Sequence, residues 1–483
     1  MPFWGVSGSG ILERPSTKKV REMSQITFAD FVETTFKKFN IPGVAVGVWA
    51  DGKEISACHG VTSVDNPLPI DQNTLFALGS ITKSFTATTL IHLVAEGKVE
   101  LSAPVRRYLP EFQLKDPQAA ENITVLNLLN HTSGLDWRVN VDTGEGDDAL
   151  QRYVAKMAEV DLIAPLGSRV SYSQAGYNLL GRLIENVTGV AFEQAVAQLL
   201  FEPLGLSHSF FARDDIMTRR FAVGHDRAQD GTLSIARPWR HSRGDAPGGG
   251  IASSVADLLR WGRFHLSDGC TESGIQVLPT HVLRQMKEPT AQLRASSLGD
   301  AIGLCWFLRD VDGVRTVGHG GSANGQFSEL LLVPERNFAV ISLTNAGPDG
   351  IPFNQAIVRF ALEHYLGLVD RDQEPIPFDA ARAREIAGTY ENEMMTFTID
   401  TVGAGLRLAV RIKPEIRKAS KNAPPPDPEP ADFGLLPGSS NEYIITSGEL
   451  KGQRGFFTRD TSGVVVGVDL AGRLFSRVPL SSE

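Results

Sequence analysis

The sequence predicts an α+β protein: an antiparallel sheet flanked by helices with a mainly helical subdomain, and a small β-barrel-like domain at the C-terminus. Asp51-Gly52 is a strong hairpin signal between the first two strand-like segments. Three further strand-like segments lie far along the chain, and helical patterns fill the interval. This order favours an α+β layout over a doubly wound parallel sheet. The strand-like segments are residues 44–49, 54–59, 314–318, 327–333 and 338–344.

Helical periodicity dominates the middle of the chain. The first predicted helix opens at Ser80 and stops near Gly97, and a second covers residues 174–189 and ends at Gly189. Two more are expected at about 255–264 and about 354–366. These segments supply the helices that flank the sheet.

Four regions follow from changes in composition. We expect an N-terminal arm (1–26), a main domain (27–370), a linker (371–380) and a β-rich, lipocalin-like domain (381–483). Short strand patterns in the last region are separated by Gly-rich turns, and residues 422–434 are too proline-rich for regular structure. The strand patterns cover residues 397–399, 406–410, 443–445 and 464–468.

The composition is that of a globular protein. Of 483 residues, 42% are hydrophobic and 21% are charged, which argues against extended disorder. A net charge of −9 without a dense Lys/Arg run argues against nucleic acid or an anionic membrane as partner, and the basic residues 413–421 are interpreted as a solvated linker. Three scattered cysteines form no disulfide framework or zinc spacing, and no signal peptide or membrane span is visible, so we expect a cytoplasmic protein.

Ser80-Ile81-Thr82-Lys83 is the first candidate for chemistry. Residues three apart on a helix share a face, so the Lys83 amine can reach the Ser80 hydroxyl. A serine at a helix N-terminus also lies where developing negative charge is favoured. The pattern alone is weak, because it equally fits a capping serine and a surface lysine, and residues 16–19 match it too.

The blocks around this motif give it a context. The sequence resembles the serine β-lactamase and penicillin-binding-protein superfamily over roughly residues 27–370. It is most similar to the class C β-lactamases, D-Ala-D-Ala carboxypeptidases, D-aminopeptidases and related carboxylesterases, and this implies a β-lactamase/transpeptidase-like fold. The resembling blocks are FALGSITKSFTATTLIHLVAEGKVELSAPVRRYLPEF, LLNHTSGL, SYSQAGYNLLGRLIE and VGHGGSANGQFSELLLVPERNFAVISLTN.

The second family motif, Tyr-x-Asn, aligns with Tyr172-Ser173-Gln174. The resemblance implies that Tyr172, its pKa lowered by nearby cations, exchanges protons with Ser80 and the leaving group. Gln174 stands where the family has the asparagine that binds the substrate amide, and it is longer by one methylene. A literal Tyr-x-Asn at residues 390–392 lies in the second domain and is interpreted as a coincidence.

The third motif aligns with His319-Gly320-Gly321, a His-x-Gly of the kind carried by several peptidases of the family. Gly320 and Gly321 let the substrate backbone approach closely, and the N–H of Ser322 is expected to face that of Ser80 as the second oxyanion donor. The resemblance implies that His319 binds a substrate carboxylate or helps to protonate the leaving group.

The resulting hypothesis is a serine hydrolase that cleaves an amide or peptide bond through a Ser80 acyl-enzyme, as a peptidase or D-amino-acid amidase. A carboxylesterase is the alternative, because ester cleavage tolerates the altered second motif. A β-lactamase and a non-catalytic scaffold on the same fold remain further alternatives. The C-terminal domain is expected to border the cleft and to supply no essential catalytic group.

Other mechanisms lack their motifs. No H-E-x-x-H or other metal spacing and no G-x-S-x-G elbow occurs, and His131 is interpreted as structural. We therefore expect no metal and no cofactor. The expected partner is a small peptide, amide or ester substrate, with homo-oligomerisation possible.

Overall fold

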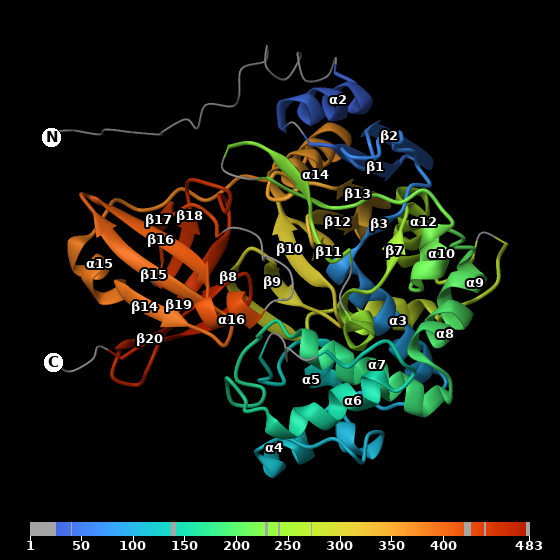
Figure 1. The fold of residues 1–483 in the computed structure, drawn as a ribbon, viewed down its shortest axis with the longest axis horizontal. Helices are drawn as coiled ribbons and strands as arrows, with labels where there is room; N and C mark the ends of the chain where they lie inside the picture. The colour runs from blue at the N-terminus through green and yellow to red at the C-terminus, as the bar shows by residue number, and fades with distance from the viewer. Residues whose placement is uncertain are drawn as a thin grey trace, which may run out of the picture.

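The computed structural model describes residues 26–39, 41–136, 142–227, 230–239, 242–271, 273–419, 427–438 and 441–479. The predicted N-terminal arm lies outside these ranges apart from its last residue, and so do residues 422–426 of the proline-rich segment. A main domain holds a large sheet with helices around it, and a separate β-barrel stands beside it (Figure 1).

An eight-stranded antiparallel sheet forms the centre of the main domain. Strand β1 pairs with both β2 and β13, so the sheet joins the two ends of the domain, and the predicted α+β class is confirmed. In spatial order the strands are β2 (Lys53–Gly60), β1 (Gly43–Ala50), β13 (Phe338–Thr344), β12 (Gln326–Val333), β11 (Val314–Ala323), β10 (Phe307–Val311), β9 (Gly299–Ile302) and β8 (Ala291–Ser296).

Strand β11 is longer than its sequence pattern indicates. The sequence pattern predicts a strand over residues 314–318, and the glycines that follow have low strand propensity. Pairing with β12 carries the strand on to Ala323, whereas β10 pairs with it only as far as Gly318. No strand in the described part of the chain pairs with the other edge of residues 319–323, so that edge is free.

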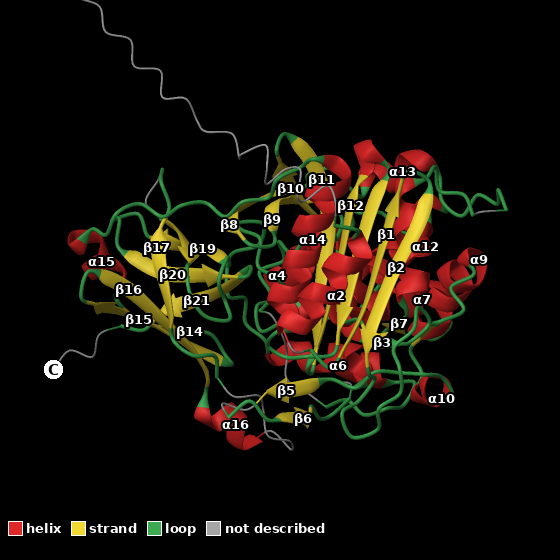
Figure 2. Cartoon of the chain, turned by 90° about the horizontal axis from the view of Figure 1, so that it is seen from above, coloured by secondary structure: helices red, strands yellow, loops and turns green. Residues whose placement is uncertain are grey.

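Helices cover both faces of this sheet (Figure 2). Helices α2 (Phe28–Phe39) and α14 (Gly350–Leu366) pack on one face and build a core with β1 and β13. Helix α12 (Val255–Leu266) packs on the other face, where a Cβ at Gly47 would stand 2.9 Å from the Val255 and Leu259 side chains. Glycine in β1 therefore permits the close approach of α12.

Helix α3 (Thr82–Ala95) runs through the interior of the main domain, and residues 82–91 along it are all buried. Ser80 lies in the single 3₁₀ turn Gly79–Ile81 that leads into this helix, so the prediction of a serine at a helix start holds. The surrounding helices are α4 (Pro117–Asn122), α5 (Val125–Leu129), α6 (Ala149–Lys156), α7 (Gln174–Thr188), α8 (Phe192–Val196), α9 (Glu202–Leu204), α10 (Arg213–Met217), α11 (Ala246–Gly249) and α13 (Thr280–Gln285).

Short strands complete the main domain. The small sheet of β3 (Phe76–Ala77), β7 (Ala252–Ser253) and β4 (Ser209–Phe210) holds the segment just before Ser80. A two-stranded ribbon joins β5 (His225–Arg227) to β6 (Leu233–Ile235).

The C-terminal domain is a closed eight-stranded barrel, as predicted, with its own apolar core. Residues 431–435 form a barrel strand, although we predicted that the proline-rich segment reaching residue 434 has no regular structure. The correction follows from Ala431–Leu435 pairing on both sides, beyond the last proline. The strands are β14 (Gly388–Glu391), β15 (Met395–Val402), β16 (Gly405–Ile412), β17 (Ala431–Leu435), β18 (Glu442–Ile445), β19 (Arg454–Arg459), β20 (Val465–Leu470) and β21 (Arg473–Arg477), with helices α15 (Ala380–Ile386) and α16 (Pro414–Ala419).

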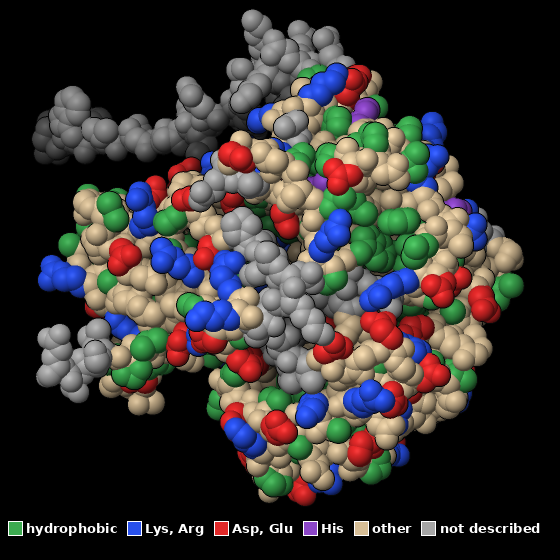
Figure 3. Space-filling view, viewed as in Figure 1, with side chains coloured by type: hydrophobic (Ala, Val, Ile, Leu, Met, Phe, Trp, Pro, Cys, Tyr) green, Lys and Arg blue, Asp and Glu red, His purple; other side chains and the backbone are tan. Residues whose placement is uncertain are grey.

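The surface of the described chain carries no dominant charge of one sign on the face shown in Figure 3, where basic and acidic side chains are interspersed over both domains. Among the described residues, no helix combines the length and the apolar character needed to cross a membrane.

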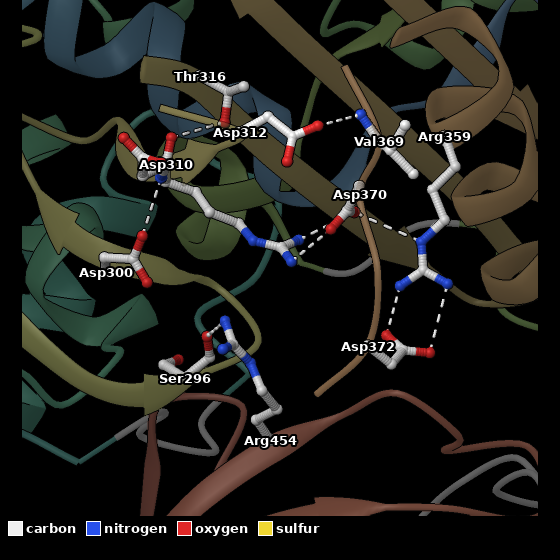
Figure 4. A network of polar contacts seen from close by, with 11 residues as sticks. Ser296, Asp300, Asp310, Asp312, Thr316, Arg359, Val369, Asp370, Asp372 and Arg454 are labelled. Atoms are coloured by element: carbon white, nitrogen blue, oxygen red, sulfur yellow. Dashed lines mark hydrogen bonds and ion pairs between the residues drawn. The ribbon is translucent and has the colours of Figure 1, made fainter. Parts of the chain in front are cut away.

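Ion pairs fasten the segment between the two domains to the main domain (Figure 4). Arg309 donates to both carboxylate oxygens of Asp370, at 2.6 and 3.2 Å, and Arg359 pairs with Asp370 and Asp372. The backbone N–H of Val369 donates to Asp312. The chain therefore leaves the main domain along a fixed path.

A buried ion pair joins the barrel to the main domain. Arg169 donates to Asp469 of β20 over 2.6 Å, and the two side chains are 14% and 1% exposed. Three residues further along each segment, the backbone N–H of Tyr172 donates to the carbonyl oxygen of Gly472 over 2.8 Å. The turn between β20 and β21 is thus docked on the segment that carries Tyr172.

Arg169→Met should lower the free energy of unfolding by about 3–5 kcal/mol, because it leaves the Asp469 carboxylate buried without its partner. The control is Arg407→Met, which removes an ion pair of 46% and 55% exposed side chains on the barrel surface and should cost about 0–1 kcal/mol. Guanidinium denaturation of both variants measures the difference. Equal losses in the two variants would show that the junction does not depend on this pair.

Candidate active site

Ser80 and Lys83 lie together, as the spacing predicts. Lys83 Nζ is 3.2 Å from Ser80 Oγ. Lys83 is completely buried, whereas Ser80 lines a cavity of about 550 Å³. The hydroxyl therefore faces a space that a substrate can enter, with the amine behind it.

Two further oxygen atoms surround the Lys83 amine. Its Nζ donates to Gln174 Oε1 over 2.6 Å and to the carbonyl oxygen of Gly248 over 2.7 Å. Neither oxygen can donate a hydrogen bond in return. A neutral amine has two N–H groups and one lone pair, so these contacts use both N–H groups and leave the lone pair for the Ser80 hydroxyl.

Burial also favours the neutral form of this amine. It lowers the pKa of Lys83 to about 7, and the positive charge of Arg473 adds to that effect. No ion pair to Lys83 occurs within the described chain. Geometry and solvation thus agree that Lys83 can accept the Ser80 proton near neutral pH.

Gln174 lies beside Lys83 and outside the cavity lining. Its Nε2 donates to Asn178 Oδ1 and to the carbonyl oxygen of Asp245, both at 3.2 Å, which fixes Oε1 toward the amine. A Cβ at Gly248 would stand 1.9 Å from Gln174 Nε2, so the glycine makes room for the longer side chain. A contact between Gln174 and the substrate stays a prediction.

Tyr172 stands on the other side of Lys83, with its ring centroid 5.0 Å from Nζ. Its buried hydroxyl has no hydrogen-bond partner in the described geometry, although Ser80 lies near enough to influence it. Burial raises the pKa of Tyr172 far above its usual value, and the opposing effects of Ser80 and Arg473 are smaller. The expected lowering of this pKa by cations is therefore wrong, because burial outweighs them and keeps Tyr172 a neutral phenol.

His319 is also held neutral. Its Nδ1 lies 2.6 Å from the carbonyl oxygen of Gly320, which assigns the ring proton to Nδ1. Nε2 is buried without a partner. Burial, followed by the charge of Lys83, lowers the pKa of His319 to about 3. A neutral ring offers no positive charge to a carboxylate, so the arrangement favours His319 as a hydrogen-bond acceptor beside Tyr172, 6.1 Å away between ring centroids.

Glycines bring the end of β11 against the turn that carries Ser80. A Cβ at Gly79 would stand 2.6 Å from the Ser322 backbone nitrogen, and one at Gly321 would stand 3.0 Å from that of Ser80. Gly79 also has φ +52°, which favours glycine. The backbone nitrogens of Ser80 and Ser322 therefore lie close together at this contact, and their pairing as oxyanion donors stays a prediction.

The barrel contributes to the same cavity. Ala471, Arg473 and Phe475, from the β20–β21 turn and β21, line it together with Ser80 and Tyr172. The Arg473 guanidinium carbon is 5.9 Å from the Tyr172 ring centroid. The expectation that this domain borders the cleft fits this arrangement, and Arg473 in addition brings a positive charge into the site.

Sequence reasoning missed Arg473 and Gly248 as site residues. Gly248 lies in the glycine-rich turn that the sequence displays, but nothing in that pattern indicates a carbonyl aimed at Lys83. Arg473 comes from a barrel strand more than 150 residues after His319, with no motif to mark it. His131, interpreted as structural, lies against Tyr172 with 4.6 Å between ring centroids and the rings tilted by 48°, and its Nδ1 accepts from the Ser173 N–H.

Metal ligation has no support in the described chain, where no group of three or more His, Cys, Asp or Glu side chains is arranged to hold an ion. The groups gathered at the site are a serine hydroxyl, an amine, a phenol, an imidazole and backbone N–H donors.

This combination of fold and site defines the serine hydrolases of the β-lactamase and penicillin-binding-protein class. Residues 28–361 match the family model described as Beta-lactamase, and the chain belongs to that family. Penicillin-binding protein 4 of Amycolatopsis lactamdurans is 33% identical over 362 residues, covering 73% of this chain and 94% of that protein. The predicted superfamily membership is confirmed.

Solved structures extend the likeness to the barrel. The crystal structure of SurE has a TM-score of 0.73 at 24% identity and covers 95% of this chain and 100% of its own. An octameric penicillin-binding protein homologue from Pyrococcus abyssi has a TM-score of 0.62 at 23% identity and covers 93% of this chain and 99% of its own. At these identities the two structures show a shared two-domain fold.

The rate of labelling by a fluorophosphonate should rise about tenfold per pH unit up to pH 7 and level off above about pH 8, because only neutral Lys83 can accept a proton. Burial also raises the pKa of Glu329, in the same cavity, to about 7, so this carboxyl group could titrate in the same pH range. The pH dependence of labelling should therefore be measured for Glu329→Gln as well. The rise in rate up to pH 7 should persist in this variant. Lys83→Arg should not label, since its side chain stays charged. A labelling rate that keeps rising until about pH 10 would show that Lys83 has its ordinary pKa.

Proposed function

We propose that the chain hydrolyses amide or peptide bonds through an acyl-enzyme on Ser80, as a peptidase or D-amino-acid amidase. The carrying observation is the buried Lys83 amine, whose Nζ donates to Gln174 Oε1 and the Gly248 carbonyl and lies 3.2 Å from Ser80 Oγ, so that the neutral amine has its lone pair left for Ser80. A buried amine of this kind is a base that works near neutral pH.

In the proposed acylation, Lys83 takes the Ser80 proton as Oγ bonds to the substrate carbonyl carbon. The carbonyl oxygen becomes an oxyanion between the N–H groups of Ser80 and Ser322. The adduct collapses when the bond to the leaving nitrogen breaks and that nitrogen receives a proton. Water then attacks the ester carbonyl, and Ser80 recovers its proton.

Tyr172 fits the role of proton donor to the leaving nitrogen. Its raised pKa keeps the phenol protonated until the nitrogen, which becomes strongly basic as the bond breaks, removes the proton. Return of the Lys83 proton to Tyr172 then restores both groups. His319 Nε2 can accept a hydrogen bond from the phenol or from a substrate N–H.

Amides come first among substrates because His319-Gly320-Gly321 and the appended barrel both resemble the peptidase branch of the family. An esterase is the second candidate, and the observation that favours it is the altered motif Tyr172-Ser173-Gln174: an alkoxide leaves with less protonation than an amine needs. β-Lactamase activity and a non-catalytic scaffold are outcomes of the same test. The cytoplasmic location and homo-oligomerisation remain predictions, the latter supported by the octameric state of one structural relative.

A substrate panel tests this function. We expect the protein to hydrolyse D-aminoacyl p-nitroanilides or D-Ala-D-Ala peptides with a higher kcat/KM than short p-nitrophenyl esters or nitrocefin. Ser80→Ala should lower turnover of every hydrolysed substrate by on the order of 10⁶ and keep the fold, because it removes the nucleophile.

The matched control is Ser102→Ala, an exposed serine in the same domain, which should keep wild-type rates. If Ser80→Ala kept a tenth of the wild-type turnover, the acyl-enzyme mechanism would be wrong. A higher kcat/KM for the esters would move the assignment to an esterase.

A further inference from the structure

Glu329 lines the same cavity as Ser80 but has no partner in the described chain. It lies on β12 opposite Gly320 of β11 and is partly exposed to the cavity. No hydrogen bond or ion pair to its carboxyl group occurs among the described residues. Buried or half-buried carboxylates are usually paired, so this one calls for an explanation.

The side chains nearest to this carboxyl group on its own strand are apolar. Phe327 and Leu331 flank it two residues away on the same face of β12, and Val358 of α14 lines the cavity there too. Of the arginines that line the cavity, Arg309 and Arg359 are bound to Asp370 and Asp372. Burial raises the pKa of Glu329 to about 7, and no neighbouring charge opposes that effect.

The absence of a side chain at Gly320 leaves room for the Glu329 carboxyl group. A Cβ at Gly320 would stand 2.8 Å from Glu329 Oε2, so the carboxyl group occupies the space that any other residue there would need. Its neighbour Gly321 touches Ser80 from the opposite face of β11, with its Cβ position 3.0 Å from the Ser80 nitrogen. Standard bond lengths then limit the separation of the Ser80 nitrogen and the Glu329 carboxyl to at most about 13 Å.

The cavity reaches both faces of β11, since its lining includes His319 and Gly321 on one face and Glu329 on the other, and the unpaired edge of residues 319–323 lies between them. A group joined to the scissile carbonyl by several single bonds can follow this route. Its end would meet a carboxylate in a weakly solvated space, where a charge-assisted hydrogen bond is stronger than in water.

We infer that Glu329 forms a subsite for a primary ammonium group carried on a flexible chain, such as a lysine or ornithine side chain next to the scissile bond. The inference rests on the proposed function, because it takes Ser80 as the reacting residue. It specifies the substrate class as a basic amide or peptide. Glu329 recognises the charge and takes no part in bond breaking.

Protection of Ser80 from a neutral fluorophosphonate tests the subsite without requiring turnover. The competitors are Nα-acetyl-lysine methylamide and its uncharged analogue with norleucine, each as the D and L form. For wild type, the lysine compound of one form should halve the labelling rate at a concentration about 10–100-fold lower than its norleucine analogue. Glu329→Gln should abolish that difference and leave the norleucine value unchanged.

Glu335→Gln is the matched control, because it removes the same charge from an exposed side chain in the turn after β12. It should keep the full preference for lysine. Glu329→Gln should unfold at the same temperature as wild type or higher, since no partner is lost and an unpaired carboxyl is removed.

The outcomes separate this inference from the proposed function. If wild type does not label at Ser80, the proposed function fails. If it labels but lysine and norleucine compounds protect equally in both forms, or if Glu329→Gln weakens both alike, the ammonium subsite is wrong while the hydrolase assignment stands.

Discussion

The burial of one lysine amine is the constraint on which the rest of the site depends. Three oxygen atoms surround Lys83 Nζ, those of Gln174, Gly248 and Ser80, and none of them carries a charge that would hold the amine protonated. The neutral amine satisfies this environment, and burial places its pKa at about 7. Burial also keeps Tyr172 protonated and His319 neutral, so the same physical effect determines the protonation state of all three groups. The roles of Lys83 as base and Tyr172 as acid therefore follow from loss of solvation more than from any ion pair.

The fold maintains this pocket from several distant segments. The 3₁₀ turn before α3 carries Ser80 and the first turn of α3 carries Lys83, α7 brings Gln174, and the short helix α11 brings the Gly248 carbonyl. Strand β11 closes the front, because glycines at 79 and 321 let it approach the nucleophile turn. The barrel adds the last wall, since the turn before Arg473 accepts the Tyr172 N–H. The second domain is therefore part of the site's surroundings, and its ion pair between Arg169 and Asp469 holds that wall in place.

Much of this arrangement could be predicted from the sequence, and the features that could not be predicted depend on tertiary structure. Hydrophobic periodicity and turn residues indicated the α+β sheet and the barrel, and the Ser80-x-x-Lys83 spacing placed the two groups on one face. The end of β11 was missed because pairing with β12 overrides the low strand propensity of its glycines. The direction of the Tyr172 pKa shift was missed because burial is a tertiary property that outweighs the nearby cation. Gly248, Arg473 and Glu329 reach the site through packing alone, and no local pattern marks them.

The most direct test of this account is the location of a covalent adduct after reaction with a fluorophosphonate near pH 8. The account predicts that the intact mass increases by one adduct and that the modified proteolytic peptide carries it on Ser80. It also predicts that Lys83→Met, which removes the base and keeps the fold, gains no adduct over the same time. An adduct on a residue other than Ser80, or an unchanged labelling rate in Lys83→Met, would contradict the claim that the buried amine activates this serine.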